Sequence, residues 1–314
     1  MIRKAITYFI FITVLLFGLR ELHYYGLLKQ KEGYYAKYKT AFFQKNHYTV
    51  LFLGSSRVEM HYNTQLFDTL TGENSFNLSL AGATPQVAFA ALKAYLVNSA
   101  PPEKLFYEID YHFIKNKSNE IKEFNNYFPF LKNETLRSEF SKIDNRMNHF
   151  YYDPYFSFPY TGFKNLSTSV HGWMGVPNLT DSLYYKGYLK EVLRPHLKYD
   201  SAQPVFSYFN ITDRNYLDSI IILCQKNKTI ISLITSPLFA GGKLDVANKE
   251  QVISHLQNIA GIHKIEYYNF SSLSFCNQRT LFVDHFHMNA GGASEYTHYF
   301  ASFYNNKWRG NALK

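Results

Sequence analysis

The pattern of apolar and polar positions opens with a long apolar run near the N-terminus. Residues 5–19 contain no charged side chain, and Lys4 and Arg20 flank them. A helix of that length covers ~22 Å, less than the ~30 Å hydrocarbon core of a membrane, and the two cations can reach its surfaces by snorkelling. A cleaved signal peptide has a similar basic start, but no small-x-small cleavage site follows Leu19. We therefore expect an uncleaved membrane anchor at residues 1–22 and a helical linker at residues 23–46.

Short apolar runs then alternate with polar, helix-compatible segments. The apolar runs predict five strands, at residues 48–53, 75–80, 105–109, 229–235 and 265–270. Helices are expected at residues 63–70, 212–227, 249–260 and 289–304, and Thr84 can cap a further helix that Pro85 opens. This alternation is typical of a parallel sheet with helices on both faces. We predict an α/β fold, a three-layer α/β/α sandwich with a mostly parallel five-stranded sheet.

The alternation stops between residues 115 and 209. This segment is rich in Asn, Tyr, Phe and Lys and has no clear periodicity, although residues 134–147 and 182–193 are compatible with helices. We interpret it as an insertion that forms a cap or a substrate wall; a decorative insertion without function is the alternative. The globular domain is accordingly predicted at residues 47–314, with this insertion at about 115–209.

Composition and charge exclude some classes of function. The chain has 46% hydrophobic and 18% charged residues, which describes a folded protein and not a disordered one. Its net charge of +9 would attract nucleic acid, anionic lipid or anionic polysaccharide. No dense run of Lys and Arg and no zinc-finger spacing is present, so we expect no nucleic-acid partner. Cys224 and Cys276 are too few for a disulfide framework, and the sequence does not decide whether they pair.

Candidate chemistry begins where the first strand ends. Gly54 breaks the apolar run, and Ser55, Ser56 and Arg57 follow. A buried strand that ends in a tight turn lifts a hydroxyl above the edge of the sheet, which is the geometry that a serine nucleophile needs. Gly-Ser-Ser also occurs in ordinary strand–helix turns in which a serine caps the helix, so this turn alone does not decide between the two.

A second group of reactive side chains lies near the C-terminus, where Asp284 and His287 precede the last predicted helix. A serine hydroxyl needs an adjacent base, and a third group should orient that base. If this loop packs over the end of the first strand, His287 reaches Ser56. Surface residues before a helix are the alternative. Asp-x-x-His can also ligate a metal, but no third ligand cluster is evident, so we expect no metal.

Three motifs resemble, in order, blocks one, two and five of the SGNH/GDSL hydrolase superfamily. They are the Gly54–Arg57 turn, the segment from Asn77 to Gly82, and Asp284 with His287. The Gly-Ser-Ser form with a membrane anchor resembles the branch that contains DltD, the D-alanyl-lipoteichoic acid biosynthesis protein, and is similar to alginate O-acetylation proteins. The resemblance covers roughly residues 47–110 and 210–304 and implies an SGNH/flavodoxin-like fold.

The resemblance also implies roles for individual residues. Ser56 matches the nucleophile, His287 the general base and Asp284 the residue that orients it. The backbone N–H groups of Ser56 and Gly82 would form the oxyanion hole.

The third block departs from the family pattern. The family usually shows Gly-x-Asn-Asp there, whereas this chain has Glu-Ile-Asp-Tyr-His at residues 108–112. The asparagine donor is absent, and His112 falls near its place in one register and would be the substitute donor. Arg57, beside the nucleophile, could bind an anionic acceptor; a surface cation beside a turn is the alternative.

The function implied by the resemblance is that of a membrane-anchored serine esterase or O-acyltransferase acting on cell-envelope glycan or polymer, without a cofactor. A membrane-bound O-acyltransferase would be its partner. The extracytoplasmic location rests on the resemblance, because the lysines after the anchor do not favour it by charge. One alternative is a catalytically weak accessory protein that binds glycan or an acyl carrier. Another is a small-molecule-binding α/β domain without chemistry.

Overall fold

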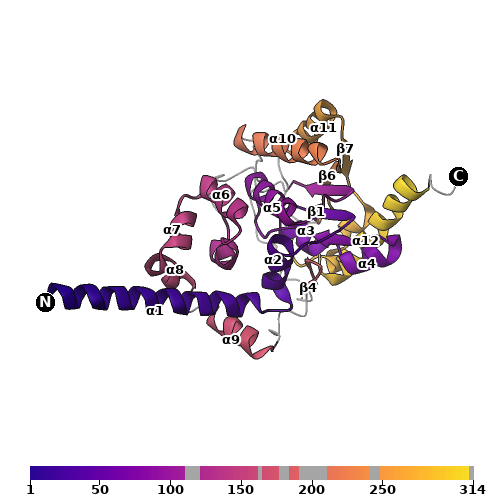
Figure 1. The fold of residues 1–314 in the computed structure, drawn as a ribbon. Coiled ribbons are helices and arrows are strands. Elements are labelled where there is room, and N and C mark those ends of the chain that lie inside the picture. Colours follow the sequence, from indigo (N-terminus) through magenta and orange to yellow (C-terminus); the bar gives the residue numbers. More distant parts are fainter. Residues whose placement is uncertain (110–120, 162–164, 177–183, 191–210, 241–247, 311–314) are drawn as a thin grey trace.

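The sheet confirms the predicted fold class. The computed structural model describes residues 1–109, 121–161, 165–176, 184–190, 211–240 and 248–310, and within them five parallel strands form one sheet in the order β2-β1-β3-β6-β7 (Figure 1). The strands are β1 (Val50–Leu53), β2 (Ser75–Asn77), β3 (Lys104–Glu108), β6 (Ile230–Thr235) and β7 (Glu266–Asn269). In chain order this is the 2-1-3-4-5 arrangement of flavodoxin-like folds.

Helices cover both faces of the sheet because the central strands are apolar on both sides. In β1, Leu51 and Leu53 belong to one core cluster, and Val50 and Phe52 belong to another, as the twofold alternation of a strand requires. The first cluster is completed by α2 (Gly33–Phe43), α5 (Pro85–Asn98), α10 (Ile211–Lys226) and α11 (Lys249–His263). The second is completed by α3 (Ser56–His61), α4 (Thr64–Thr71) and α12 (Ala290–Tyr304).

The helix after the first strand begins earlier than the sequence indicates. We expected helical structure from residue 63, but α3 starts at Ser56, directly after the turn, and a separate helix α4 follows. The side chain of Asn63 separates the two helices, because it caps α4 by accepting a hydrogen bond from the backbone N–H of Leu66 at 3.1 Å. The other cap was predicted correctly: Thr84 accepts from the backbone N–H of Val87, and Pro85 is the first residue of α5.

The N-terminal helix α1 (Ile2–Leu28) is long and apolar enough to cross a membrane, and it projects away from the sheet (Figure 1). It continues past residue 22, where the anchor was predicted to end. The segment that follows it includes α2, whose Ala41 and Phe42 are buried in the core of the domain.

The described residues of the insertion form several helices and one hairpin. Its elements are η1 (Phe124–Phe130), α6 (Glu134–Ile143), α7 (Arg146–Tyr152), α8 (Pro154–Thr161), α9 (Leu166–Met174), β4 (Tyr184–Tyr185) and β5 (Tyr188–Leu189). Both α8 and α9 pack against α1. Three short helical turns complete the described chain: η3 (Ser274–Asn277), η4 (Arg279–Leu281) and η5 (Asn305–Arg309).

The helix that residues 182–193 were said to be compatible with is not formed at residues 184–190, the part of this range that the structure describes. Tyr184–Tyr185 and Tyr188–Leu189 pair as antiparallel strands around a two-residue turn. The two turn residues, Lys186 and Gly187, both have positive φ, which is the conformation that a tight hairpin of this length favours. Lys-Gly is a weaker turn signal than Asn-Gly, and for this reason the hairpin was not predicted from the sequence.

Candidate active site

The Gly54–Arg57 turn is built by the end of β1 and the start of α3. Gly54 has φ +156°, and a Cβ atom there would lie 2.5 Å from Cγ2 of Val58 and 2.9 Å from the carbonyl oxygen of Glu108. Only glycine therefore lets α3 start so close to the end of the strand. The hydroxyl of Ser55 accepts a hydrogen bond from the backbone N–H of Arg57, so Ser55 caps the helix and Ser56 is its first residue.

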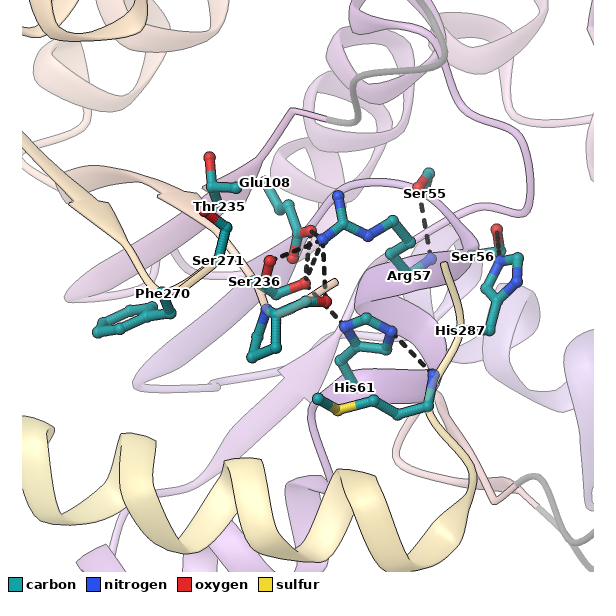
Figure 2. Close-up of polar contacts among 12 residues, drawn as sticks. Ser55, Ser56, Arg57, His61, Glu108, Thr235, Ser236, Phe270, Ser271 and His287 are labelled. Carbon is teal, nitrogen blue, oxygen red and sulfur yellow. Dashed lines mark hydrogen bonds and ion pairs between the residues drawn. The ribbon is translucent and has the colours of Figure 1, made fainter. Parts of the chain in front are cut away.

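The structure brings the three residues of the predicted triad together. Oγ of Ser56 lies 2.8 Å from Nε2 of His287 (Figure 2). On the other side of the ring, Nδ1 of His287 lies 2.8 Å from Oδ2 and 3.0 Å from Oδ1 of Asp284. These contacts are the hydrogen-bond pattern that a serine nucleophile, its base and an orienting carboxylate need.

Hydrogen bonds within the C-terminal loop hold Asp284 in place. Its Oδ1 accepts from the backbone N–H groups of Phe286 and His287, both at 2.8 Å. Burial by itself would raise the pKa of Asp284, but the hydrogen bond and charge of His287, with these two N–H groups, lower it below its ordinary value. The ionised carboxylate favours a proton on Nδ1 of His287, which leaves Nε2 free to accept the proton of the Ser56 hydroxyl.

Gly82 lies on a segment that runs beside the Gly54–Arg57 turn. The backbone N–H of Leu78 donates to the carbonyl of Phe52, and that of Leu80 donates to the carbonyl of Gly54, so the pairing with β1 continues past the end of β2. Gly82 has φ +68°, and a Cβ atom there would lie 2.4 Å from Cδ of Lys122. The segment thus ends in a left-handed glycine near the turn, which suits a backbone N–H donor. His112, the predicted third donor, lies outside the described residues.

Arg57 does not form the surface anion site that was suggested. Its side chain is completely buried, and its Nη2 atom lies 3.1 Å from Oε1 of Glu108. The same nitrogen donates to the carbonyl oxygen of Ser236 at 2.8 Å and to its Oγ at 2.9 Å. The guanidinium therefore faces a carboxylate inside the protein and not an anion in solvent.

A buried polar cluster next to the triad was missed at the level of sequence. Nδ1 of His61 lies 2.7 Å from Oγ of Ser236, and that hydroxyl lies 2.6 Å from Oε1 of Glu108 (Figure 2). Glu108 ends β3, Ser236 directly follows β6, and His61 ends α3. The position of Glu108 and Ser236 at the ends of two strands was the available signal, because side chains at the carboxyl ends of parallel strands meet at one edge of the sheet.

Among the residues that the structure describes, no group of three or more His, Cys, Asp or Glu side chains is arranged to hold a metal ion. Cys224 and Cys276 are both buried and are not bonded to each other. Burial raises the pKa of the Cys224 thiol to about 12, so it is not a nucleophile at neutral pH.

No protein-family model matches the chain, and no curated protein matches it. Among solved structures it is similar to a family two carbohydrate esterase from Clostridium thermocellum in complex with cellohexaose and to an active site mutant of such an esterase from the same organism. Each similarity has a TM-score of 0.37 and 8% sequence identity and covers 85% of this chain. The chain spans 64% and 65% of the length of those structures.

Proposed function

We propose that this protein is a membrane-anchored serine esterase or O-acyltransferase of the SGNH type, in the DltD-like branch, with a cell-envelope glycan or polymer as its substrate. The supporting observation is the contact of Ser56 with His287, and of His287 with Asp284, each at 2.8 Å. In this proposal the domain lies on the extracytoplasmic side, where such substrates are found, and α1 holds it at the membrane.

The reaction would begin with attack by Oγ of Ser56 on the carbonyl carbon of an ester. Nε2 of His287 takes the hydroxyl proton, and the charge that develops on the carbonyl oxygen is stabilised by the backbone N–H groups of Ser56 and Gly82. When the tetrahedral intermediate collapses, the C–O bond to the alcohol breaks and His287 returns the proton to the leaving oxygen. Asp284 stays ionised throughout and stabilises the imidazolium.

The acyl-enzyme would then pass its acyl group to one of two acceptors. His287 deprotonates either water, which gives hydrolysis, or a polysaccharide hydroxyl, which gives transfer. Transfer needs a supply of acyl groups at the membrane, and we propose a membrane-bound O-acyltransferase as the partner that provides them. With p-nitrophenyl acetate and a soluble polysaccharide, hydrolysis releases equal amounts of p-nitrophenol and acetate, whereas transfer leaves acetate below p-nitrophenol.

A fluorophosphonate probe tests the proposal directly. The full-length protein in detergent should be labelled, the label should map to Ser56 by mass spectrometry, and Ser56→Ala should be neither labelled nor active on a p-nitrophenyl ester. Labelling or activity that survives in Ser56→Ala would remove this serine from the mechanism.

A second candidate function is that of an accessory protein that binds glycan or an acyl carrier and assists a membrane enzyme. The observation that favours it is the absence of the third-block asparagine from residues 108–112, because a lost oxyanion donor commonly costs ~10²–10³ in rate. A folded protein that binds glycan but is not labelled by the probe would support this role over the esterase.

A further inference from the structure

A buried chain of hydrogen bonds lies beside the serine–histidine pair (Figure 2). The backbone N–H of Met288 donates to Nε2 of His61 at 3.1 Å. Nδ1 of His61 lies 2.7 Å from Oγ of Ser236, and this hydroxyl donates to Oε1 of Glu108 at 2.6 Å. All of these side chains are buried, and His61 has no exposed surface.

The directions of these hydrogen bonds are fixed by their donors. A backbone N–H can only donate, so Nε2 of His61 accepts from Met288 and the ring proton sits on Nδ1. Oγ of Ser236 then accepts hydrogen bonds from His61 and from Arg57 and donates one to Glu108. These three bonds use both lone pairs and the one proton of the Ser236 hydroxyl. Burial lowers the pKa of His61 well below its ordinary value, and the charges of Arg57 and His287 lower it further. A hydrogen bond with the backbone of Phe286 raises this pKa but does not offset the other effects, so the neutral ring that this pattern needs is the stable form.

The chain connects the two halves of the triad. Met288 follows His287 in the sequence, and His61 belongs to the same short helix α3 that Ser56 opens. One imidazole therefore fastens the loop that carries the base to the helix that carries the nucleophile. Its other nitrogen is fixed in turn by Ser236, at the end of a neighbouring strand.

We propose that His61 is a positioning residue that sets the separation of Ser56 and His287 through its hydrogen bond to Met288. This inference rests on the proposed serine chemistry. It predicts a loss in the chemical step and not in substrate binding, because a displacement of ~1 Å in a catalytic group can cost ~10²-fold in rate.

Two substitutions at His61 separate this role from general stability. His61→Gln can keep a hydrogen-bond acceptor near the position of Nε2, within reach of Met288, whereas His61→Asn is too short and can keep only the contact near Nδ1. We expect kcat on a p-nitrophenyl ester to fall ~10–100-fold in His61→Asn with KM little changed, and to fall several-fold less in His61→Gln. His263→Asn is the matched control, because it removes another partly buried histidine hydrogen bond, to Asp218 at 2.7 Å, far from the site.

The results distinguish the possible failures. Equal activity in His61→Asn and in wild type would overturn the positioning role, and so would equal losses in the Asn and Gln variants. The positioning role would also be overturned if His61→Asn and His263→Asn both lost kcat in proportion to their loss of thermal stability. A wild-type protein that the fluorophosphonate probe does not label would instead refute the proposed esterase chemistry, and the positioning role with it.

An independent observation concerns the surface beside α1. Helix α9 is fastened to the C-terminal part of α1, since Oγ of Ser169 donates to the carbonyl of His23 at 2.9 Å and Nε1 of Trp173 donates to that of Leu22 at 3.1 Å. The outer face of α9 is apolar and exposed at helical spacing. Its exposed apolar residues are Leu166, Val170, Trp173 and Met174.

The side chains at this junction have the composition of a membrane–water boundary. The ring of Trp173 lies 4.9 Å from that of Tyr25, and Nζ of Lys29 lies 4.4 Å from the centre of the Trp173 ring. Trp and Tyr are enriched at the headgroup level, where lysine can extend toward water. From Lys4 to Arg20, the two cations that flank the charge-free run, α1 rises ~24 Å. With both side chains extended to the surfaces of the ~30 Å hydrocarbon core, Leu22 and the residues after it lie at the headgroup level.

Helix α8 follows α1 farther toward its N-terminus. The ring of Tyr155 stacks on Phe9 at 5.9 Å, and its hydroxyl lies 2.6 Å from Oγ1 of Thr13. Residues 154–161 carry no charged side chain. The helix is thus uncharged, and the Tyr155 hydroxyl is satisfied by α1, as an apolar surrounding requires of a polar group.

We propose that α9 lies in the headgroup region of the bilayer that α1 crosses, so that the partner of this face is lipid and the domain is held against the membrane at two places. This proposal does not depend on the serine chemistry. The chain has only two tryptophans, Trp173 and Trp308. Trp308 lies in η5, where its ring packs 5.0 Å from Tyr304 and 5.5 Å from Phe106, on the sheet and away from α1.

The two tryptophans give a direct test in phosphatidylcholine vesicles. In Trp308→Phe, the remaining Trp173 should be strongly quenched by lipid brominated close to the headgroup and little quenched by aqueous iodide. In Trp173→Phe, the remaining Trp308 should not be quenched by brominated lipid. Equal lipid quenching of both tryptophans would overturn the proposal. The absence of lipid quenching of Trp173 would also overturn it, including when the protein does not bind the vesicles.

Discussion

Oγ of Ser56 and Nε2 of His287 lie 2.8 Å apart although 231 positions separate the two residues in the sequence. The last helix, α12, produces this contact by packing across the first strand. The ring of Phe300 packs 5.9 Å from that of Phe52, and the hydroxyls of Tyr62 and Tyr296 lie 2.9 Å apart in the same core. The loop that begins this helix is thereby carried over the end of β1, where the serine stands.

Substitution Asp284→Asn should lower kcat strongly and leave the fold intact. The amide can donate to Nδ1 of His287, which favours the wrong tautomer and places a proton on the nitrogen that should accept from Ser56. We expect a loss of ~10²–10⁴-fold in the rate of ester hydrolysis, by analogy with other triads. The measurement is steady-state kinetics on a p-nitrophenyl ester together with the rate of fluorophosphonate labelling.

The control for this substitution is a second Asp–His pair in the same chain. Asp218 contacts Nε2 of His263 at 2.7 Å on the outer helices α10 and α11. Asp218→Asn should leave kcat unchanged. Similar losses in both variants would mean that Asp284 acts through stability and not through the orientation of His287.

The two adjacent serines should behave differently. Ser55→Ala removes the cap of α3 and should cost about 1 kcal/mol of the free energy of unfolding, while most of the esterase activity remains. Ser56→Ala should lower activity ~10⁴-fold or more and change stability little, because its hydroxyl is not a cap. Thermal unfolding and esterase rates, measured on both variants, check the assignment; the reverse pattern would make Ser55 the nucleophile.

Gly82→Ala tests the oxyanion hole. A side chain at φ +68° is strained and should cost ~1 kcal/mol of stability, and the methyl group displaces the segment that carries the N–H donor. Gly72→Ala is the matched control, because Gly72 has φ +66° at the end of α4, outside the site. Both variants should unfold at lower temperature, but only Gly82→Ala should also lose ~10²-fold in kcat. Equal kcat in the two variants would exclude Gly82 from the oxyanion hole.

Much of the fold could be predicted from sequence because local signals agree with the tertiary structure. The apolar run that contains β1, the break at Gly54 and the Thr84–Pro85 start of α5 each specify one backbone conformation. The spacing of Asp284 and His287 allowed both to be placed in one short loop, and the structure puts them in contact with each other.

The parts that were missed depend on contacts between distant segments. Arg57 looks like a surface cation beside a turn, and only the position of Glu108 at the end of β3 makes it a buried ion pair. Ser236 looks like the polar end of a strand, and its role appears only when His61 and Arg57 converge on it. The periodicity and propensities of a sequence do not show which strand ends are neighbours in the sheet. The arrangement of the strand ends decides where polar groups can be buried with partners.

A buried ion pair connects helix α3 to the segment that follows α1. Nζ of Lys37, on α2, lies 2.8 Å from Oε1 of Glu59, on α3, and 3.1 Å from Oγ of Ser79; the side chains of Lys37 and Glu59 are 1% and 5% exposed. Burial lowers the pKa of Lys37, and the charge of Glu59 only partly opposes this effect. The pair is therefore held against a large cost of desolvation.

Substitution Lys37→Met should destabilise the domain by ~3–5 kcal/mol, because it leaves the Glu59 carboxylate buried without its cation. The double variant Lys37→Met/Glu59→Met removes both charges and should recover most of this loss, which denaturant unfolding of the full-length protein in detergent would measure. A double variant as unstable as the single one would show that Lys37 contributes packing or its bond to Ser79 and not charge compensation. Because Glu59 lies on the helix that Ser56 opens, the single variant should also label more slowly with the fluorophosphonate probe, and the double variant should restore labelling together with stability.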